Sequence, residues 1–326
     1  LRPRRQRQMC IRDSVNSAAE ARELAEQLWL KCEQLQADLP SITSSRSPTQ
    51  LANGNPDLWK QRYSRAVERG IELVNGGELH KLVLAVRHTI DLDNRFNPLP
   101  LLQRLRRQQA GSCRFLWQRE ADDVFFGASP ERLLSLRGGW LRSDALAGTA
   151  GEGDDGMQLL RSDKDRREHE LVVDTLTNQL RQMGLTPCRR RQPQLARHGQ
   201  LTHLHTPITA EVQGRSALSL AEQLHPTPAV AGLPRREAMA WLRTLEPFER
   251  GCYAAPIGWI DSAGDAELRV AIRCGHARGR HLDLTAGAGL VRGSIAERER
   301  QEVELKLAVL ADQLKLQTSE RNRSIV

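Results

Sequence analysis

Two stretches of this sequence each carry a pair of carboxylates separated by one helix turn. Asp165 and Glu168 are three residues apart, and so are Glu299 and Glu302. Residues at this spacing share one face of a helix, and hard divalent cations such as Mg²⁺ prefer carboxylate oxygens. Two such helices facing each other would therefore offer four oxygen ligands to one metal ion.

The same stretches also fit ordinary ion pairs on helix surfaces. Lys164 and Glu168 are four residues apart, as are Glu302 and Lys306, and opposite charges at this spacing commonly pair on a solvated face. The spacing alone leaves both a metal site and two solvated salt-bridge faces open.

Two other residues are of types that can take part in chemistry. Lys81 opens the apolar segment Lys81-Leu-Val-Leu-Ala-Val-Arg87. A lysine, unlike an arginine, can become a usable base when it is buried, although a lysine at a strand start can also extend to solvent along its aliphatic stem. Glu131 lies in a turn between two expected strands, where a turn carboxylate paired with Arg132 is the simplest interpretation.

Arg273 and a pair of histidines lie on expected strands. Arg273 belongs to the apolar segment Leu-Arg-Val-Ala-Ile-Arg-Cys, and an inward arginine is costly to bury unless it meets a carboxylate, from a ligand or from the protein. His203 and His205 alternate and so share a face. Two histidines alone are a weak sign of a metal, so hydrogen-bonded core side chains are the simpler interpretation.

The elements that position these residues are long helices and several short strands. Apolar spacing predicts helices at 15–39, 57–75, 98–109, 157–183, 217–224 and 235–245, and a last one after Gly293. Strand patterns occur at 81–87, 113–119, 123–128, 132–142, 202–213, 254–261, 267–275 and 280–286. Strands joined by turns, with a few helices between them, predict an α+β fold of antiparallel sheets with helices packed outside.

The glycine-rich segment Gly287-Ala-Gly-Leu-Val-Arg-Gly293 lies between the last strand and the last helix. It is one residue too long for a dinucleotide-binding fingerprint, and no acidic strand end follows about 20 residues later. Backbone amides at this helix start can nevertheless hold a carboxylate.

The composition narrows the class of protein. The chain has 326 residues, 39% hydrophobic content and a net charge of +8, which favours anionic partners. No apolar run is long enough to span a membrane. The six scattered cysteines show no C-x-x-C pair, so reduced thiols in a cytoplasmic protein are expected. A basic nucleic-acid-binding protein is the alternative of another class, but the arginine runs match no binding motif.

Together these segments resemble the chorismate-utilising enzymes, from about Asp57 to Leu316. The motifs that carry the resemblance include Lys81-Leu-Val-Leu-Ala, Gly127-Ala-Ser-Pro-Glu-Arg-Leu-Leu134, Leu146-Ala-Gly-Thr149, Asp163-Lys-Asp-Arg-Arg-Glu-His-Glu170, Leu224-His-Pro-Thr-Pro-Ala-Val230, Gly251-Cys-Tyr-Ala-Ala-Pro-Ile-Gly258, Ala286-Gly-Ala-Gly289 and Glu299-Arg-Gln-Glu-Val-Glu-Leu-Lys306. The resemblance implies two stacked antiparallel β-sheets with helices outside.

Three positions make the chain resemble the isochorismate synthases within this family. Lys81 would be the base that activates water. Ala147 replaces the nucleophilic lysine of aminodeoxychorismate relatives, and Ala229 replaces a threonine common in amine-adding and lyase relatives. A salicylate synthase, which adds a lyase step on the same scaffold, is the alternative. The resemblance does not distinguish menaquinone, phylloquinone and siderophore pathways.

The resemblance also implies a mechanism. Mg²⁺ would be held by Glu168 and Glu302 directly, and by Asp165 and Glu299 through water. Lys81, as a neutral amine, would activate water for attack on C2 of chorismate, and Glu131, kept protonated by burial, would protonate the departing C4 hydroxyl. The implied substrate contacts are Gly148, Thr149, His203, Ala229, Tyr253, Arg273, Gly287, Ala288, Gly289 and Lys306.

The resemblance divides the chain into three parts. Residues 1–56 are expected to form an arm, a helix and a linker that correspond to an incomplete version of the family's N-terminal region. Residues 57–318 would form the chorismate-binding catalytic domain and 319–326 a tail. We expect a cytoplasmic monomer with a small-molecule substrate, no nucleic-acid partner and no membrane association.

Overall fold

The structure is a computed structural model that describes residues 50–51 and 58–314, except 93, 152–155 and 213, and a few isolated positions between 19 and 30. The chain divides into two compact units, 1–47 and 48–326. The expected helix at 15–39 falls almost entirely outside the described residues, as does the tail at 319–326.

Sheet A contains seven strands and carries the candidate base. Its strands are β1 (Gln50–Leu51), β2 (Lys81–Leu92), β3 (Cys113–Glu120), β4 (Asp123–Ser129), β10 (Gly232–Leu233), β13 (Cys274–Arg278) and β14 (His281–Leu290). They are ordered β1-β2-β14-β13-β4-β3, and β10 also pairs with β2. Lys81 starts the long strand β2, which pairs with β14 from Leu82 opposite Leu290 to Asp91 opposite His281.

Sheet B also has seven strands. They are β5 (Arg132–Arg137), β6 (Trp140–Ala150), β7 (Cys188–Arg189), β8 (Gln194–His198), β9 (Leu201–Glu211), β11 (Pro256–Ile260) and β12 (Ala266–Val270). The order is β11-β12-β5-β6-β9-β7, with β8 on β9. Every strand pairing in both sheets is antiparallel.

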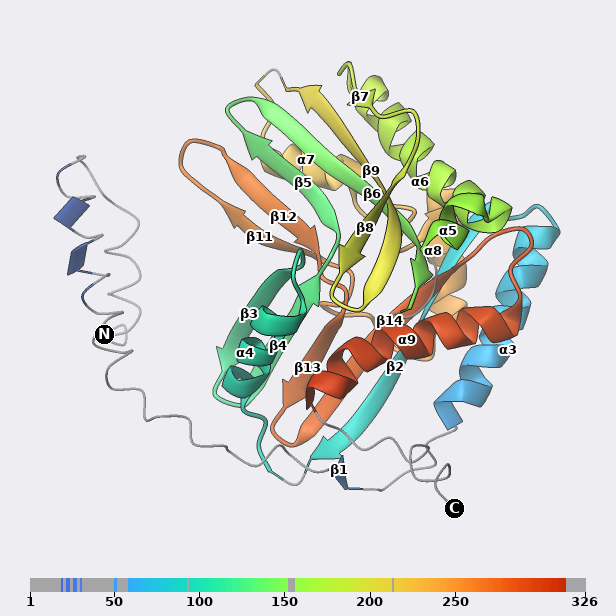
Figure 1. Ribbon diagram of the computed structural model, residues 1–326, viewed down its shortest axis with the longest axis horizontal. Coiled ribbons are helices and arrows are strands. Elements are labelled where there is room, and N and C mark those ends of the chain that lie inside the picture. The colour runs from blue at the N-terminus through green and yellow to red at the C-terminus, as the bar shows by residue number, and fades with distance from the viewer. Residues whose placement is uncertain are drawn as a thin grey trace. The chain divides into compact units, whose positions relative to one another are not determined.

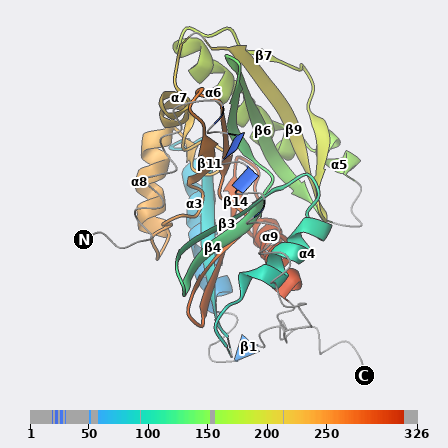
Figure 2. The same ribbon diagram turned by 90° about the vertical axis from the view of Figure 1, so that its left-hand side faces the viewer.

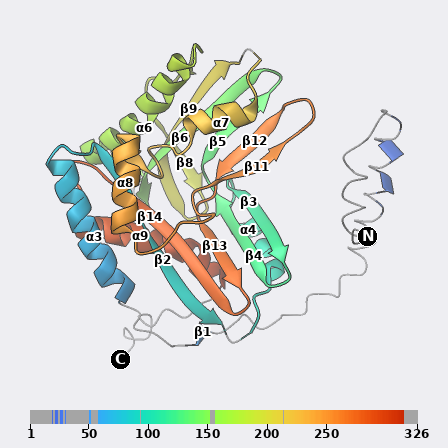
Figure 3. The same cartoon turned by 180° about the vertical axis from the view of Figure 1, so that it is seen from behind.

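Helices cover the sheets. They are α3 (Leu58–Asn75), α4 (Pro98–Gln108), α5 (Met157–Arg161), α6 (Asp163–Gln182), α7 (Ala217–Leu224), α8 (Arg235–Leu245) and α9 (Ala296–Leu314). The red helix α9 lies against β14 of sheet A and contacts α3 (Figure 1). From behind, α3 and α8 both lie along β2 (Figure 3). The side view shows α4 next to α9 (Figure 2), while α6 packs on β6 and β9 of sheet B.

Two large apolar cores follow from this layering. The first joins one face of sheet A to α3, α4, α8 and α9. The second contains residues from the other face of sheet A, such as Ala85, Phe125 and Cys274, together with sheet B, α6 and α7. Alternate residues of a strand face opposite sides, so sheet A contributes to both cores. The predicted α+β fold of two antiparallel sheets with helices outside is confirmed.

Several predicted element boundaries are wrong. The helix expected at 157–183 is two helices, because the chain is extended at Ser162. The strand expected at 267–275 is interrupted at 271–273, where the chain passes from β12 in sheet B to β13 in sheet A. Arg273 has φ +51 there and lies between the strands instead of inside one. None of the described helices has the length and apolar character needed to cross a membrane.

Candidate active site

The carboxylate pairs predicted from spacing lie on two helices, α6 and α9. Ser162 caps α6: its hydroxyl accepts a hydrogen bond from the backbone N–H of Asp165 at 3.2 Å, so the helix begins just before its acids. Asp165, Glu168, Glu299 and Glu302 are called the acid cluster below. Glu168 and Glu299 are buried, and all four carboxylates interact electrostatically with the Lys164 ammonium.

Lys164 brings the two helices of the acid cluster together. Its Nζ lies 3.0 Å from Glu299 Oε1 on α9, 3.4 Å from Glu168 Oε2 and 3.8 Å from Asp165 Oδ1. The other pair expected on a helix face also forms, with Lys306 Nζ 2.7 Å from Glu302 Oε1. The ion pairs therefore exist as spacing suggested, but they are not on solvated faces, because their carboxylates are largely removed from water.

The four carboxylates do not share one electrostatic environment. Burial and the nearby charge of Glu302 raise the pKa of Glu299 to about 7. Burial also acts to raise the pKa of Glu302, but the ammonium groups of Lys306 and Lys164 and a hydrogen bond from Thr149 hold it at about 2. Thr149 donates its hydroxyl to Glu302 Oε1 at 2.9 Å. One member of the cluster is thus firmly ionised while another is readily protonated near neutral pH.

Lys81 is the most deeply buried lysine of the site. Its side chain is 1% exposed, and its Nζ lies 3.0 Å from Glu168 Oε1. Gly289 on the neighbouring strand β14 leaves the space for this pair: a Cβ there would lie 2.2 Å from Glu168 Oε1 and 3.0 Å from Lys81 Cε. A side chain at position 289 would therefore displace both groups, so the glycine is required by close approach.

Glu131 lies at the junction between β4 in sheet A and β5 in sheet B. It is 3% exposed, its N–H donates to Ser129 Oγ at 3.2 Å, and Thr227 donates its hydroxyl to Glu131 Oε1 at 3.3 Å. Burial raises its pKa to about 7, against the opposing effects of Thr227 and of the cations Lys81, Arg273 and Lys306. A carboxyl group in this environment can act as an acid near neutral pH. The simple pairing with Arg132 expected for a turn is wrong, because Arg132 pairs with Asp144 and Glu267.

Arg273 is buried without a carboxylate within ion-pairing distance among the described residues. Its Nη2 donates to His203 Nε2 at 3.2 Å, and His203 Nδ1 is 2.7 Å from the carbonyl oxygen of Gly148. The carbonyl can only accept, so His203 carries its proton on Nδ1 and is neutral. Burial and Arg273 lower its pKa well below the usual value. An arginine fixed in this way and lacking an acid partner is suited to bind a ligand carboxylate.

The residues on β14 face two directions. A Cβ at Gly287 would lie 3.1 Å from the hydroxyl of Tyr253, and Lys306 Nζ donates to the Gly287 carbonyl at 2.7 Å. Gly287 and Gly289 therefore face the candidate site. Ala288, between them, belongs to the first apolar core, so only its backbone is available to a ligand.

Ala229 lies on the loop that also carries Thr227. Its side chain is partly buried against the second core, and the loop is closed by hydrogen bonds from the N–H groups of Val230 and Ala231 to the carbonyl of Thr227. Ala147 lies on β6, two residues before Thr149. Both alanines thus lie within two residues of a threonine whose hydroxyl contacts a site carboxylate, Thr149 with Glu302 and Thr227 with Glu131.

The acid cluster has donor chemistry that fits Mg²⁺. Its ligands are all carboxylate oxygens, and Glu299 Oε2 is buried without a hydrogen-bond partner, which is costly unless a cation or water satisfies it. Within the described part of the chain, no three His, Cys, Asp or Glu side chains converge closely enough to hold a metal as they stand. Lys164 lies between them instead.

Sequence reasoning missed three residues of this site. Lys164 was predicted only as a partner of Glu168, because the spacing of residues along one helix cannot show its contact with Glu299 on another helix. Ser129 and Thr227 support Glu131, and only their places in the Ala-Ser-Pro-Glu and His-Pro-Thr-Pro motifs point to them. Contacts between such distant segments cannot be obtained from periodicity.

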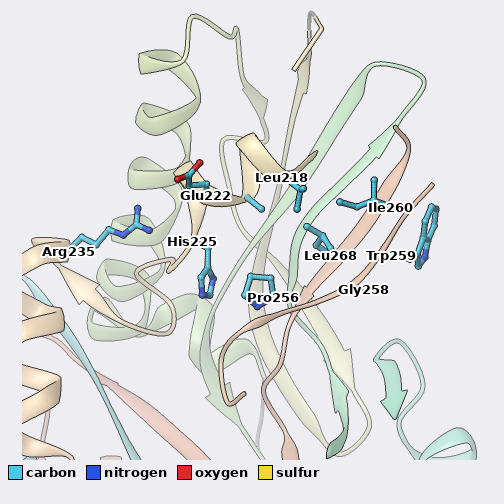
Figure 4. Close-up of a pocket in the computed structure, with 10 residues that line it drawn as sticks. Leu218, Glu222, His225, Arg235, Pro256, Gly258, Trp259, Ile260 and Leu268 are labelled. Atoms are coloured by element: carbon cyan, nitrogen blue, oxygen red, sulfur yellow. The ribbon is translucent and has the colours of Figure 1, made fainter. Parts of the chain in front are cut away.

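A separate hollow of about 780 Å³ lies between α7, the start of α8 and the β11–β12 hairpin (Figure 4). Its walls include Leu218, His225, Arg235 and Trp259. None of the predicted site residues lines it, so it is distinct from the junction that holds Lys81 and Glu131.

Comparison with known proteins identifies the family of the chain. Residues 2–315 match a family model described as chorismate binding enzyme. The chain is 36% identical over 284 residues to the salicylate biosynthesis isochorismate synthase of Pseudomonas aeruginosa, covering 84% of this chain and 59% of that protein. It is 36% identical over 259 residues to the isochorismate synthase MenF of Bacillus subtilis, covering 77% of this chain and 55% of that protein.

A solved structure gives the same result for the fold. The menaquinone-specific isochorismate synthase MenF of Escherichia coli superimposes with a TM-score of 0.75 at 31% identity, covering 87% of this chain and 68% of that one. The chain spans less than two thirds of the length of the two curated relatives above. Because the family model matches nearly the whole chain, the chain belongs to the chorismate-binding enzyme family.

Proposed function

We propose that this chain carries the active site of an isochorismate synthase, which converts chorismate into isochorismate. The observation that carries the proposal is that a lysine, Lys81, and a carboxyl, Glu131, are both buried, near enough to each other for the charge of Lys81 to oppose the rise in the pKa of Glu131. The names of the similar proteins support the same activity.

The reaction needs a base and an acid at two different carbons of the ring. Lys81, as the free amine, removes a proton from a water molecule that attacks C2, and Glu131 donates a proton to the C4 hydroxyl as it departs as water. The ring double bonds shift between these positions, so no external reductant or oxidant is needed. The pKa of Glu131, raised to about 7 by burial, leaves a large fraction of this acid protonated at neutral pH.

Lys81 must release a proton before it can act as the base. In the structure its ammonium is held by Glu168 Oε1 at 3.0 Å. A cation that binds Glu168 and neutralises its negative charge weakens the ion pair between Glu168 and Lys81. The proposed base therefore lies in direct contact with one carboxylate of the acid cluster.

Arg273, Tyr253 and Lys306 are the proposed substrate-binding groups. Arg273 offers a guanidinium that no described carboxylate neutralises, and the Tyr253 hydroxyl lies next to Gly287 on β14. Lys306 adds positive charge from α9. Chorismate carries two carboxylates, so this set of donors and cations matches the charge of the ligand.

Mg²⁺ is the proposed cofactor. Glu168 and Glu302 would hold it directly, with Asp165 and Glu299 acting through water, and when bound it would supply positive charge that orients the ring carboxylate. Asp165 and Glu168 come from α6 and the other two from α9, so the site needs both helices.

Two alanines favour water as the nucleophile. Ala147 offers no amine that could attack the ring, and Ala229 offers no hydroxyl on the loop of Thr227. We also propose a cytoplasmic enzyme that acts as a monomer. All four cysteines in the described part of the chain are free thiols, as a reducing compartment favours.

Product analysis tests the proposal. The full chain is incubated with chorismate and MgCl₂, with and without EDTA, and the products are separated chromatographically. Isochorismate without pyruvate, formed only in the absence of EDTA, is the expected result. Salicylate and pyruvate would instead indicate a salicylate synthase, and unchanged chorismate at every Mg²⁺ concentration would refute the proposed activity.

A further inference from the structure

Lys164 occupies an unusual position for a lysine. It is the second residue of α6, where the positive end of the helix dipole disfavours a cation. Its ammonium nevertheless turns inward to Glu299 on another helix, 3.0 Å away, as well as to Glu168 on its own helix. The attraction of the acid cluster therefore outweighs both the dipole and the loss of hydration.

The three ammonium groups around the acid cluster are held differently. Lys81 is 1% exposed and enclosed by the fold, and Lys306 also donates to the Gly287 carbonyl at 2.7 Å. Lys164 is 22% exposed and begins a helix at the edge of the site, so its flexible side chain has a path to solvent. Of these three cations, Lys164 has the most exposed side chain, against 15% for Lys306 and 1% for Lys81.

Lys164 also contacts three of the four carboxylates of the proposed metal site, and one of them, Glu168, would hold the metal directly. Glu168 Oε2 and Glu299 Oε1 face its Nζ, and Asp165 Oδ1 lies 3.8 Å away. A divalent cation and an ammonium group cannot both lie within contact distance of the same oxygens without strong mutual repulsion, which is weakly screened in a buried site.

We propose that Lys164 is a built-in counter-cation: its ammonium neutralises Glu168 and Glu299 in the metal-free protein and must swing out before a divalent cation binds. The inference rests on the proposed metal site. It explains how four carboxylates can stay close together before metal arrives. It also makes the affinity for Mg²⁺ weaker than the acid cluster alone would give, since the lysine has to be displaced.

The test compares Mg²⁺ binding by the full-length wild type and the variants Lys164→Gln and Lys164→Arg, using calorimetry without chorismate. Lys164→Gln should bind Mg²⁺ at least about tenfold more tightly, because the competing charge is gone. Its thermal midpoint without metal should fall and be restored by Mg²⁺. Lys164→Arg, which keeps the charge, should bind no more tightly than the wild type.

A matched control is Lys60→Gln. Lys60 pairs with Glu304 on α9 at 3.6 Å, outside the acid cluster, so its loss should leave Mg²⁺ affinity within about twofold of the wild type. Equal or weaker Mg²⁺ binding by Lys164→Gln would overturn the inference, as would absence of binding by both proteins. A raised KM for chorismate with unchanged metal affinity would instead make Lys164 a substrate ligand and also refute it.

A second measurement uses the wild type alone and does not depend on the folding of any variant. Amine labelling followed by mass spectrometry should show Lys164 protected without metal and more reactive with Mg²⁺, while Lys81 stays protected in both. Protection of Lys164 that Mg²⁺ leaves unchanged would contradict displacement. Neither readout needs turnover, so a protein that passes both tests yet forms no isochorismate would disprove the proposed function and leave this inference standing.

Discussion

Replacing Glu131 by glutamine should make the protein more stable at alkaline pH while strongly lowering its proposed activity. The side chain is 3% exposed, and burial raises its pKa from 4.5 to about 7. Above the unfolded-state pKa the unfolded chain loses this proton readily, whereas the folded protein retains it. The wild type therefore loses stability as pH rises from about 4.5 to about 7.

The magnitude follows from the size of the shift. One pKa unit corresponds to 1.36 kcal/mol, so a shift from 4.5 to about 7 costs the wild type about 3 kcal/mol once both states are ionised. Glutamine has nearly the same shape, stays neutral and can still accept the Thr227 hydroxyl through its amide oxygen. The Glu131→Gln variant should thus exceed the wild type by up to about 3 kcal/mol at pH 8, with little difference near pH 4.5.

The assay is urea-induced unfolding of both proteins at several pH values between 4.5 and 8. Isochorismate formation is measured in parallel, and loss of the acid should lower it by about 10²–10⁴-fold. Glu267→Gln is a control in which the effect on stability should have the opposite sign. Burial acts to raise the pKa of Glu267, but hydrogen bonds from Arg132 and Ser135 hold it below its usual value. That variant should lose stability above the unfolded pKa. A stability difference for Glu131→Gln that does not change with pH would refute the reasoning.

Three further substitutions probe the surroundings of the base and the acid cluster. Lys81→Ala should lower isochorismate formation by about 10²–10⁴-fold yet retain Mg²⁺-dependent chorismate binding; calorimetry that finds no binding would contradict its role as base. Gly289→Ala should also suppress turnover, because the new Cβ would lie 2.2 Å from Glu168 Oε1, and near-normal kcat would disprove the need for close approach. Thr149→Val should weaken Mg²⁺ binding by about 10–100-fold through loss of the hydrogen bond to Glu302, whereas Thr149→Ser should keep it; equal affinities in the two variants would argue against this contact.

Much of the fold could be predicted because periodicity reports how each segment is buried. The apolar run that opens β2 and the helical spacing along α6 and α9 predicted these elements in the right order, although β2 extends to Leu92 and α5 is separate from α6. The break between β12 and β13 could not be predicted, because Leu-Arg-Val-Ala-Ile-Arg-Cys alternates smoothly through it. Only the tertiary passage from one sheet to the other produces the left-handed backbone at Arg273.

The site could be predicted in part for a similar reason. Spacing identified the acid pairs and their lysines at i,i+4, but it could not show whether these side chains are exposed to water. Their burial depends on contacts between α6 and α9, which are more than 100 residues apart in the chain. The partners of Glu131 show the same limit. Thr227 is 96 residues away from it in the chain, and no local pattern relates the two positions.

The backbone at Arg273 has a consequence for evolution and engineering. A residue with a Cβ at φ +51 costs about 1–2 kcal/mol relative to relaxed backbone, a cost that glycine avoids. Selection for heat resistance alone would therefore favour glycine at this position, and selection for turnover would favour the guanidinium. If Arg273 binds the substrate as proposed, a library of this protein selected for heat resistance without substrate should accumulate inactive Arg273→Gly clones, so this position sets durability against turnover.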